Sequence, residues 1–92
     1  MESVTQWLML RYGIGVDHGA FLDEVVSGSP AANAGLQAGD VIVKFNNTDI
    51  NTADDAQQAI RAAQVGQSVQ IVYWRGKTQY TTTAVMIETP AS

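Results

Sequence analysis

The chain has 92 residues, 46% of them hydrophobic, and its nine acidic against five basic residues give a formal net charge of -4. This length fits a single domain with its own core. No apolar run is long enough to span a membrane, so we expect no direct membrane insertion, and no signal segment opens the chain. The basic residues are scattered, which argues against nucleic acid as a partner. The lack of cysteine excludes disulfides and thiolate chemistry.

The first part of the chain allows two interpretations. In residues 4–12, apolar side chains recur at spacings of three and four, which predicts a short helix with Ser3 as its cap and Gly13 as its stop. Residues 7–10 taken alone are also consistent with a buried strand. We favour the helix. Residues 13–16 then form an extended glycine-rich segment that leads into a turn.

A short helix is predicted in the middle of the chain. Ser29 can accept a hydrogen bond as an N-cap, and Pro30 suits the first helical position because its missing N–H would be unpaired there. Gly35 can adopt the left-handed conformation that ends a helix, so the helix should have about five residues. We expect Leu36 to enter the core.

Two strands flank this helix. Residues 20–26 read as a strand with Phe21 and Leu22 on opposite faces. Residues 41–45 alternate with the period of a strand, and one face carries Val41, Val43 and Phe45.

The second half of the chain predicts a longer helix followed by a hairpin. A tight turn at residues 46–49 and a short return strand at Ile50 lead to Thr52, which caps a helix running to about Gln64. Strands at residues 69–74 and 79–87 are joined across residues 75–78. We therefore expect a mainly β, α+β fold in which a small partly open barrel or sandwich of about five strands is capped by two helices, with a possible third helix at the N-terminus.

From Gly19 to Ile87 the sequence resembles PDZ domains, and specifically those of bacterial HtrA-type (trypsin-like) serine proteases. The resemblance rests on Gly-Ala-Phe-Leu, Ser-Pro-Ala-Ala-Asn-Ala-Gly-Leu, Gly-Asp-Val-Ile, the capped helix and the hairpin, in this order. It implies one PDZ-like domain over residues 1–92, with an N-terminal helix or loop at 1–18, a core at 19–87 and a tail at 88–92. It also implies that an extended polypeptide end adds a strand to the sheet beside the longer helix, with its carboxylate held by backbone N–H groups.

Two alignments of the N-terminal part lead to different carboxylate loops. In the first, Gly13, Ile14, Gly15 and Val16 form the loop, because small residues let successive amides converge on an anion. In the second, residues 11–20 resemble a segment that follows the loop and its strand, so that the loop lies upstream of Met1. The helical period of residues 4–12 favours the second alignment, although loss of that strand would expose a sheet edge and leave a gap in the core.

The longer helix would form one wall of the peptide groove. The resemblance places Asp55, Ala59 and Ala63 on the groove side and Ala62 near the pocket for the terminal side chain, and it turns Ala56 and Ile60 into the core. Small side chains here would leave room for a bulky apolar ligand residue. They equally suit a helix whose alanines serve helix propensity alone.

No catalytic or metal-binding constellation is predicted. His18 is the only histidine and falls in a turn, without a second imidazole for a metal site. Ser27 and Ser29 are explained by turn and capping chemistry. We expect no cofactor, and we expect both Trp7 and Trp74 to be partly buried.

The sequence thus predicts a non-catalytic module of a larger serine protease, binding C-terminal or unfolded polypeptide segments and acting with the protease domain of the same chain. The resemblance implies a periplasmic or other extracytoplasmic location and a role in protein quality control. One alternative parent is a site-2-type metalloprotease or a C-terminal processing protease. An alternative of another class is a structural or oligomerisation domain without free peptide binding.

Overall fold

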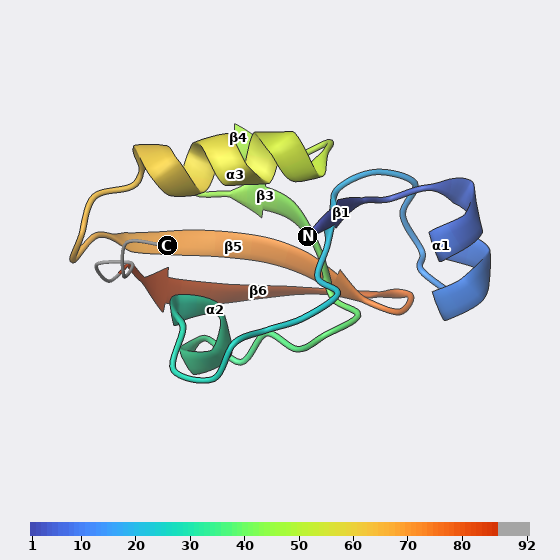
Figure 1. Ribbon diagram of the computed structural model, residues 1–92, viewed down its shortest axis with the longest axis horizontal. Helices are drawn as coiled ribbons and strands as arrows, with labels where there is room; N and C mark the ends of the chain where they lie inside the picture. Colours follow the sequence, from blue (N-terminus) through green and yellow to red (C-terminus); the bar gives the residue numbers. More distant parts are fainter. Residues whose placement is uncertain (87–92) are drawn as a thin grey trace.

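One antiparallel sheet forms the centre of the computed structural model, which describes residues 1–86 (Figure 1). Its strands run in the order β1-β2-β3-β5-β6, and β4 pairs with β3 beside this path. The strands are β1 (Glu2–Ser3), β2 (Ala20–Phe21), β3 (Val41–Phe45), β4 (Thr48–Asp49), β5 (Ser68–Arg75) and β6 (Thr78–Val85). The helices are α1 (Gln6–Tyr12), α2 (Pro30–Asn33) and α3 (Ala53–Ala62). The predicted α+β fold class is confirmed, and β1 is the strand that the prediction of about five did not include.

The helices lie around the long β5–β6 hairpin. α1 lies at the end that carries the hairpin turn, α2 lies near the opposite end, and α3 runs along the sheet (Figure 1). No helix among residues 1–86 is long and apolar enough to cross a bilayer.

The N-terminal segment forms a short helix, as the spacing of its apolar residues predicts. α1 begins after Thr5, whose hydroxyl accepts a hydrogen bond from the Leu8 amide at 3.2 Å, and it ends at Gly13 with φ 65°. The prediction of Ser3 as the cap is wrong, because the Ser3 hydroxyl accepts a hydrogen bond from the Ala53 amide at 2.9 Å. Ser3 therefore ties β1 to the start of α3.

The strand predicted at residues 20–26 is much shorter. It ends after Phe21 because its partner β3 begins only at Val41, and the chain before β3 is a turn. Phe21 and Leu22 do lie on opposite sides, as predicted, and each is buried in a different hydrophobic cluster. Leu22 belongs to the main cluster, whose buried residues are Ala20, Leu22, Leu36, Ile42, Phe45, Ile50, Ala56, Val69, Ile71, Tyr73 and Ala84. Phe21 belongs to the second cluster, whose buried residues are Leu8, Ile14, Phe21 and Val41.

The alternation predicted for residues 41–45 fails at a β-bulge. Ile42 pairs with Tyr73 and Lys44 with Val72, so Val43 is an extra residue in β3. Because the extra residue reverses the side-chain parity, Phe45 joins Ile42 in the main cluster and not Val41 in the second one.

The turn predicted at residues 46–49 and the strand predicted at Ile50 are misplaced, because β4 forms at Thr48–Asp49 and Ile50 follows it. The other elements follow the sequence closely. The Thr52 hydroxyl caps α3 by accepting from the Asp55 amide, and α3 ends two residues before the predicted Gln64. The hairpin forms as predicted, with Gly76 at φ 63° in its turn. Ile87 and the predicted tail at 88–92 lie outside the described residues.

Candidate functional site

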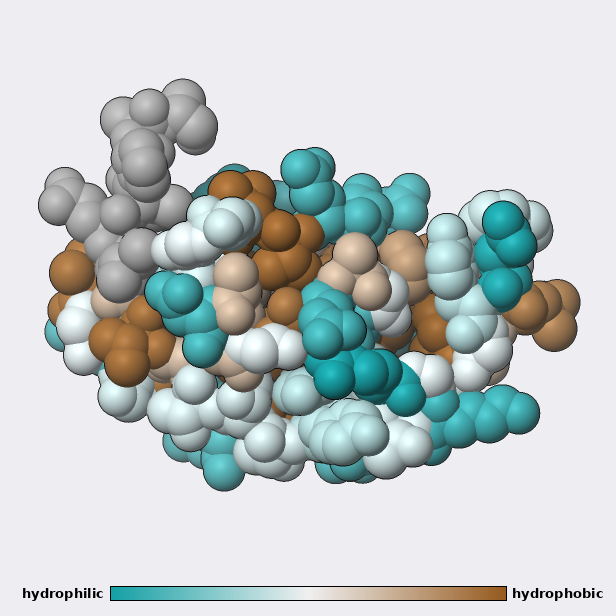
Figure 2. Space-filling view, turned by 90° about the horizontal axis from the view of Figure 1, so that it is seen from below, coloured by the Kyte–Doolittle hydropathy of each residue, from teal (hydrophilic) through white to brown (hydrophobic). Residues whose placement is uncertain are grey.

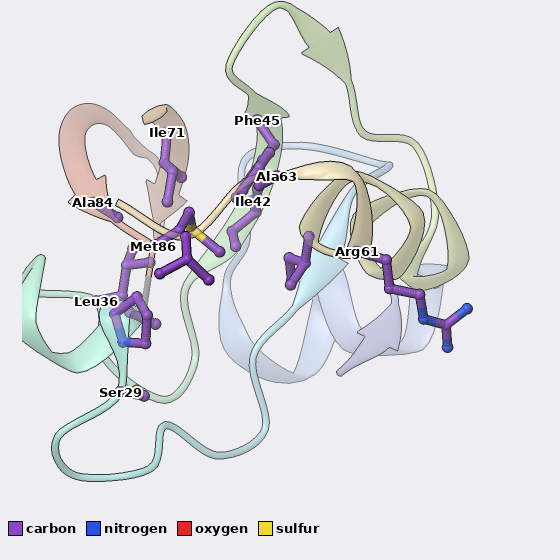
Figure 3. Close-up of a pocket in the computed structure, with 13 residues that line it drawn as sticks. Ser29, Leu36, Ile42, Phe45, Arg61, Ala63, Ile71, Ala84 and Met86 are labelled. Carbon is purple, nitrogen blue, oxygen red and sulfur yellow. The ribbon is translucent and has the colours of Figure 1, made fainter. Parts of the chain in front are cut away.

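An apolar cleft opens between the C-terminal half of α3, the core side of the sheet and the α2 segment (Figure 3). Its volume is about 540 Å³. Ile60 and Ala63 contribute to the α3 wall, and Leu36 lies on the α2 side. The sheet and the chain after it supply Ile42, Phe45, Ile71, Ala84 and Met86.

The cleft exists because the main hydrophobic cluster is not closed at this end. Leu36, Ile42 and Ile71 belong to that cluster, and Ile60 and Met86 pack against it while staying partly exposed. Val65, which also lines the cleft, is 70% exposed. Hydrophobic residues accordingly gather toward the α2 end of the face seen in Figure 2. An open apolar surface continuous with the core favours a ligand with large apolar side chains.

α2 and the loop after it form one wall of the cleft. The Ser29 hydroxyl caps α2 through the Ala32 amide, Pro30 occupies its first turn, and Gly35 follows it at φ 90°. This confirms the predicted local chemistry, with a helix of four residues. Leu36 is then turned into the main cluster at 4% exposure.

An ion pair holds this wall to the sheet. Asp40 is 1% exposed and accepts hydrogen bonds from Arg75 Nε and Nη2, both at 2.9 Å, and from the Gln37 amide at 2.8 Å. Arg75 also donates to the Gly35 carbonyl at 3.1 Å. The hydrogen bonds with Asp40 raise the pKa of the Arg75 guanidinium, so it stays charged. The network joins the loop between α2 and β3 to the end of β5.

The residues predicted on the long helix do not all reach the cleft. Ala63 lines it, whereas Ala59 and Ala62 line a separate pocket of about 110 Å³, which Ala63 also borders. Asp55 lies at the start of α3, where its carboxylate accepts a hydrogen bond from the Asn51 amide at 3.1 Å. Asp55 therefore acts in helix capping.

The segment Gly13-Ile14-Gly15-Val16 lies near the hairpin turn, at the opposite end of the molecule from α2 (Figure 1). The amides of Gly13 and Ile14 both donate to the Met9 carbonyl, and the Gly15 amide donates to the Gly76 carbonyl at 2.9 Å. Ile14 is buried in the second cluster, and Val16 packs against it. The structure thus does not bring this segment together with the residues predicted on α3, and three of its four amides have partners within the chain.

Sequence reasoning missed most of the cleft. It assigned Ile60 to the core alone, and it gave Leu36 a purely structural role. The sequence shows only that two large apolar residues, Ile60 and Val65, lie on either side of the small Ala63 near the end of the long helix. Their exposure, which marks them as part of an open surface, is known from the structure alone.

The predictions for His18 and the two tryptophans are confirmed in part. His18 lies in a bend, as predicted. His18 Nδ1 lies 2.9 Å from Asp17 Oδ1, and this hydrogen bond lowers the pKa of the Asp17 carboxyl. Trp74 is partly buried, as predicted, but Trp7 is 65% exposed, so that prediction is wrong. Among residues 1–86 there is no group of three His, Cys, Asp or Glu side chains that could hold a metal ion.

Curated relatives of this chain are named as serine proteases. The chain is 37% identical over 68 residues to a putative serine protease HhoB from Synechocystis sp. (strain ATCC 27184 / PCC 6803 / Kazusa), and the match covers 74% of the chain and 16% of the relative. It is 33% identical over 60 residues to the periplasmic pH-dependent serine endoprotease DegQ of Escherichia coli (strain K12), covering 65% of the chain and 13% of the relative. The chain therefore spans only about a sixth of the length of these relatives, or less.

Solved structures share the fold. The HtrA-type protease AlgW, solved with a decapeptide, matches with a TM-score of 0.85 at 26% identity, over 97% of this chain and 28% of that chain. The HtrA3 PDZ domain, solved with the phage-derived ligand Phe-Gly-Arg-Trp-Val, matches with a TM-score of 0.75 at 23% identity, over 90% of this chain and 76% of that chain. A family model described as PDZ domain matches residues 21–75, more than half of the chain. The chain belongs to the PDZ domain family.

Proposed function

We propose that this chain is the non-catalytic, peptide-binding module of a larger HtrA-type serine protease. It binds an extended polypeptide segment and either presents that segment to the protease domain or relays its binding. The apolar cleft beside α3 is the observation that carries this proposal. The names of the curated relatives support the parent and an extracytoplasmic location, since DegQ is named as periplasmic.

The cleft supplies the free energy for side-chain recognition. Its lining is mostly apolar, so a large apolar ligand residue that enters it gains about 1.5–3 kcal/mol from burial. Main-chain recognition can come from the sheet edge. Among residues 1–86, β1 pairs on one flank only, with β2, and it lies beside α3. An extended segment that adds to this edge forms backbone hydrogen bonds while its side chains reach the cleft.

The carboxylate-binding loop that the PDZ resemblance implies has two proposed positions, residues 13–16 or a segment upstream of Met1. Internal hydrogen bonds of the Gly13, Ile14 and Gly15 amides argue against the first position, because these donors would have to exchange partners to hold an anion. The second position is supported by α1, because the second alignment expects a short helix in this part of the chain.

A titration of fluorescently labelled Phe-Gly-Arg-Trp-Val tests the proposal. We expect saturable binding by the 92-residue chain, followed by fluorescence anisotropy. Val65→Asp should weaken it at least about tenfold, the equivalent of 1.4 kcal/mol, because Val65 lines the cleft yet is 70% exposed. Leu10→Asp is the matched control, since Leu10 is 80% exposed on α1 and lies away from the cleft.

The outcomes separate the alternatives. Equal affinity of both variants would place binding elsewhere. Absence of peptide binding, together with self-association of the chain that Val65→Asp abolishes, would favour the structural or oligomerisation domain. The metalloprotease and processing-protease parents receive no support from the relatives named above.

A further inference from the structure

β6 is an edge strand of the sheet. It pairs with β5 from Thr78 to Val85 without a register shift, and among residues 1–86 no other strand lies on its second flank (Figure 1). Within the same range, the backbone of residues 78–85 makes no hydrogen bond to any segment other than β5. Alternate residues of β6 therefore direct their N–H and C=O groups away from the sheet, where a further strand can pair with them.

This edge lacks the features that protect an exposed strand from pairing. Residues 78–85 contain no proline, no charged side chain and no bulge, and most of them are threonine or valine, which favour extended backbone. The strand at the opposite edge, β1, has only two residues. The α2 segment reaches β6 through the Thr82 hydroxyl, which donates to the Ala34 carbonyl at 2.9 Å, so it engages a side chain and leaves the backbone edge unpaired.

We propose that β6 pairs with β6 of a second copy of this chain, antiparallel and about a two-fold axis. The chain as a whole carries a net charge of -4, but its uncharged edge strand meets its own copy without like-charge repulsion. In a register centred on Thr81, Tyr80 lies opposite Thr82 of the second copy, and an aromatic residue opposite a β-branched one is a favourable cross-strand pair. Tyr80 is 44% exposed and stacks on Tyr73, with ring centroids 5.7 Å apart, so its ring is already ordered for this contact.

The contact between two edge strands is small beside the roughly 1,200–2,000 Å² that stable protein interfaces bury. We therefore expect a reversible dimer that forms at high protein concentration. The pairing is independent of the proposed function, because it does not require a peptide in the cleft.

Sedimentation velocity of the 92-residue chain over a concentration series tests this inference. We expect a monomer–dimer equilibrium whose dissociation constant rises at least about tenfold in Thr81→Lys, because the two new charges face each other across the axis. Gln70→Lys is the matched control, since Gln70 is exposed on the neighbouring strand β5 and its substitution should leave the dissociation constant unchanged. Circular dichroism establishes that both variants are folded.

Cross-linking through an introduced thiol gives a second measurement, because the chain has no cysteine of its own. Under mild oxidation Thr81→Cys should form a disulfide-linked dimer faster than Gln70→Cys, since only the first thiol faces its copy. A chain that stays monomeric at millimolar concentration and cross-links equally in both variants overturns the inference. A dimer that survives Thr81→Lys, or one that Val65→Asp abolishes, also overturns it and places the contact elsewhere.

Discussion

Removal of the Asp40 carboxylate should destabilise the chain by about 2–4 kcal/mol. Asp40 is 1% exposed, and its oxygens accept three hydrogen bonds, two of them from the Arg75 guanidinium. A buried hydrogen bond to a charged group contributes about 1.5–3 kcal/mol. The Arg75 side chain is 38% exposed and regains water when its partner is lost, so the expected cost lies below the sum of three such bonds.

Urea unfolding followed by circular dichroism measures this effect in Asp40→Ala, Arg75→Ala and the double variant. Asp49→Ala is the control, because Asp49 is exposed in β4, and it should change the free energy of unfolding by less than about 0.5 kcal/mol. A double-mutant cycle should give a coupling of at least about 1 kcal/mol between Asp40 and Arg75. A coupling near zero would refute the role given to this pair in holding the cleft wall.

Three further predictions concern the fold. Gly19→Ala should lower the free energy of unfolding by more than about 2 kcal/mol, because φ is 118° and an added Cβ would lie 2.6 Å from a backbone oxygen. Gly28→Ala should lower it by only about 1 kcal/mol, because φ is 81° but the space around it is open, and equal losses in the two variants would contradict the steric argument. Leu8→Ala should cost about 2–4 kcal/mol because Leu8 is 5% exposed, whereas Leu10→Ala at 80% exposure should leave the thermal midpoint unchanged. Thr52→Ala should lower stability by about 1 kcal/mol through loss of the α3 cap, and an unaltered urea midpoint would argue against that cap.

The protonation of Arg75 should not make stability depend on pH near neutrality. The hydrogen bonds with Asp40 raise the pKa of the Arg75 guanidinium above its already strongly basic ordinary value. Its contribution to stability is therefore complete below that ordinary value and is lost only as pH rises through the raised pKa. A fall in the urea midpoint between about pH 6 and 9 that disappears in Arg75→Ala would contradict this.

Most helix caps and helix ends could be predicted from the sequence. Caps and stops depend on one side chain and its immediate neighbours, and the structure has Ser29, Thr52, Gly13 and Gly35 in the predicted roles. The hairpin was equally clear, because its two strands are adjacent in the chain and are joined by a turn at Gly76.

Features that depend on distant partners were not predictable in the same way. The bulge at Val43 follows from the pairing of β3 with β5, and a period-two pattern carries no sign of an extra residue. The Asp40–Arg75 pair joins positions 35 residues apart. The cleft likewise depends on how α2 and α3 meet the sheet, so no single stretch of sequence identified Ile60 as part of its lining.

The central claim is that polypeptide binds in the cleft beside α3. Amide chemical-shift mapping of the ¹⁵N-labelled chain during titration with Phe-Gly-Arg-Trp-Val tests it most directly. The account predicts the largest shifts at Leu36, Ile60 and Ala63, with little change at Gly15 beside the hairpin turn. Shifts centred on residues 13–16, with the cleft unaffected, would contradict it.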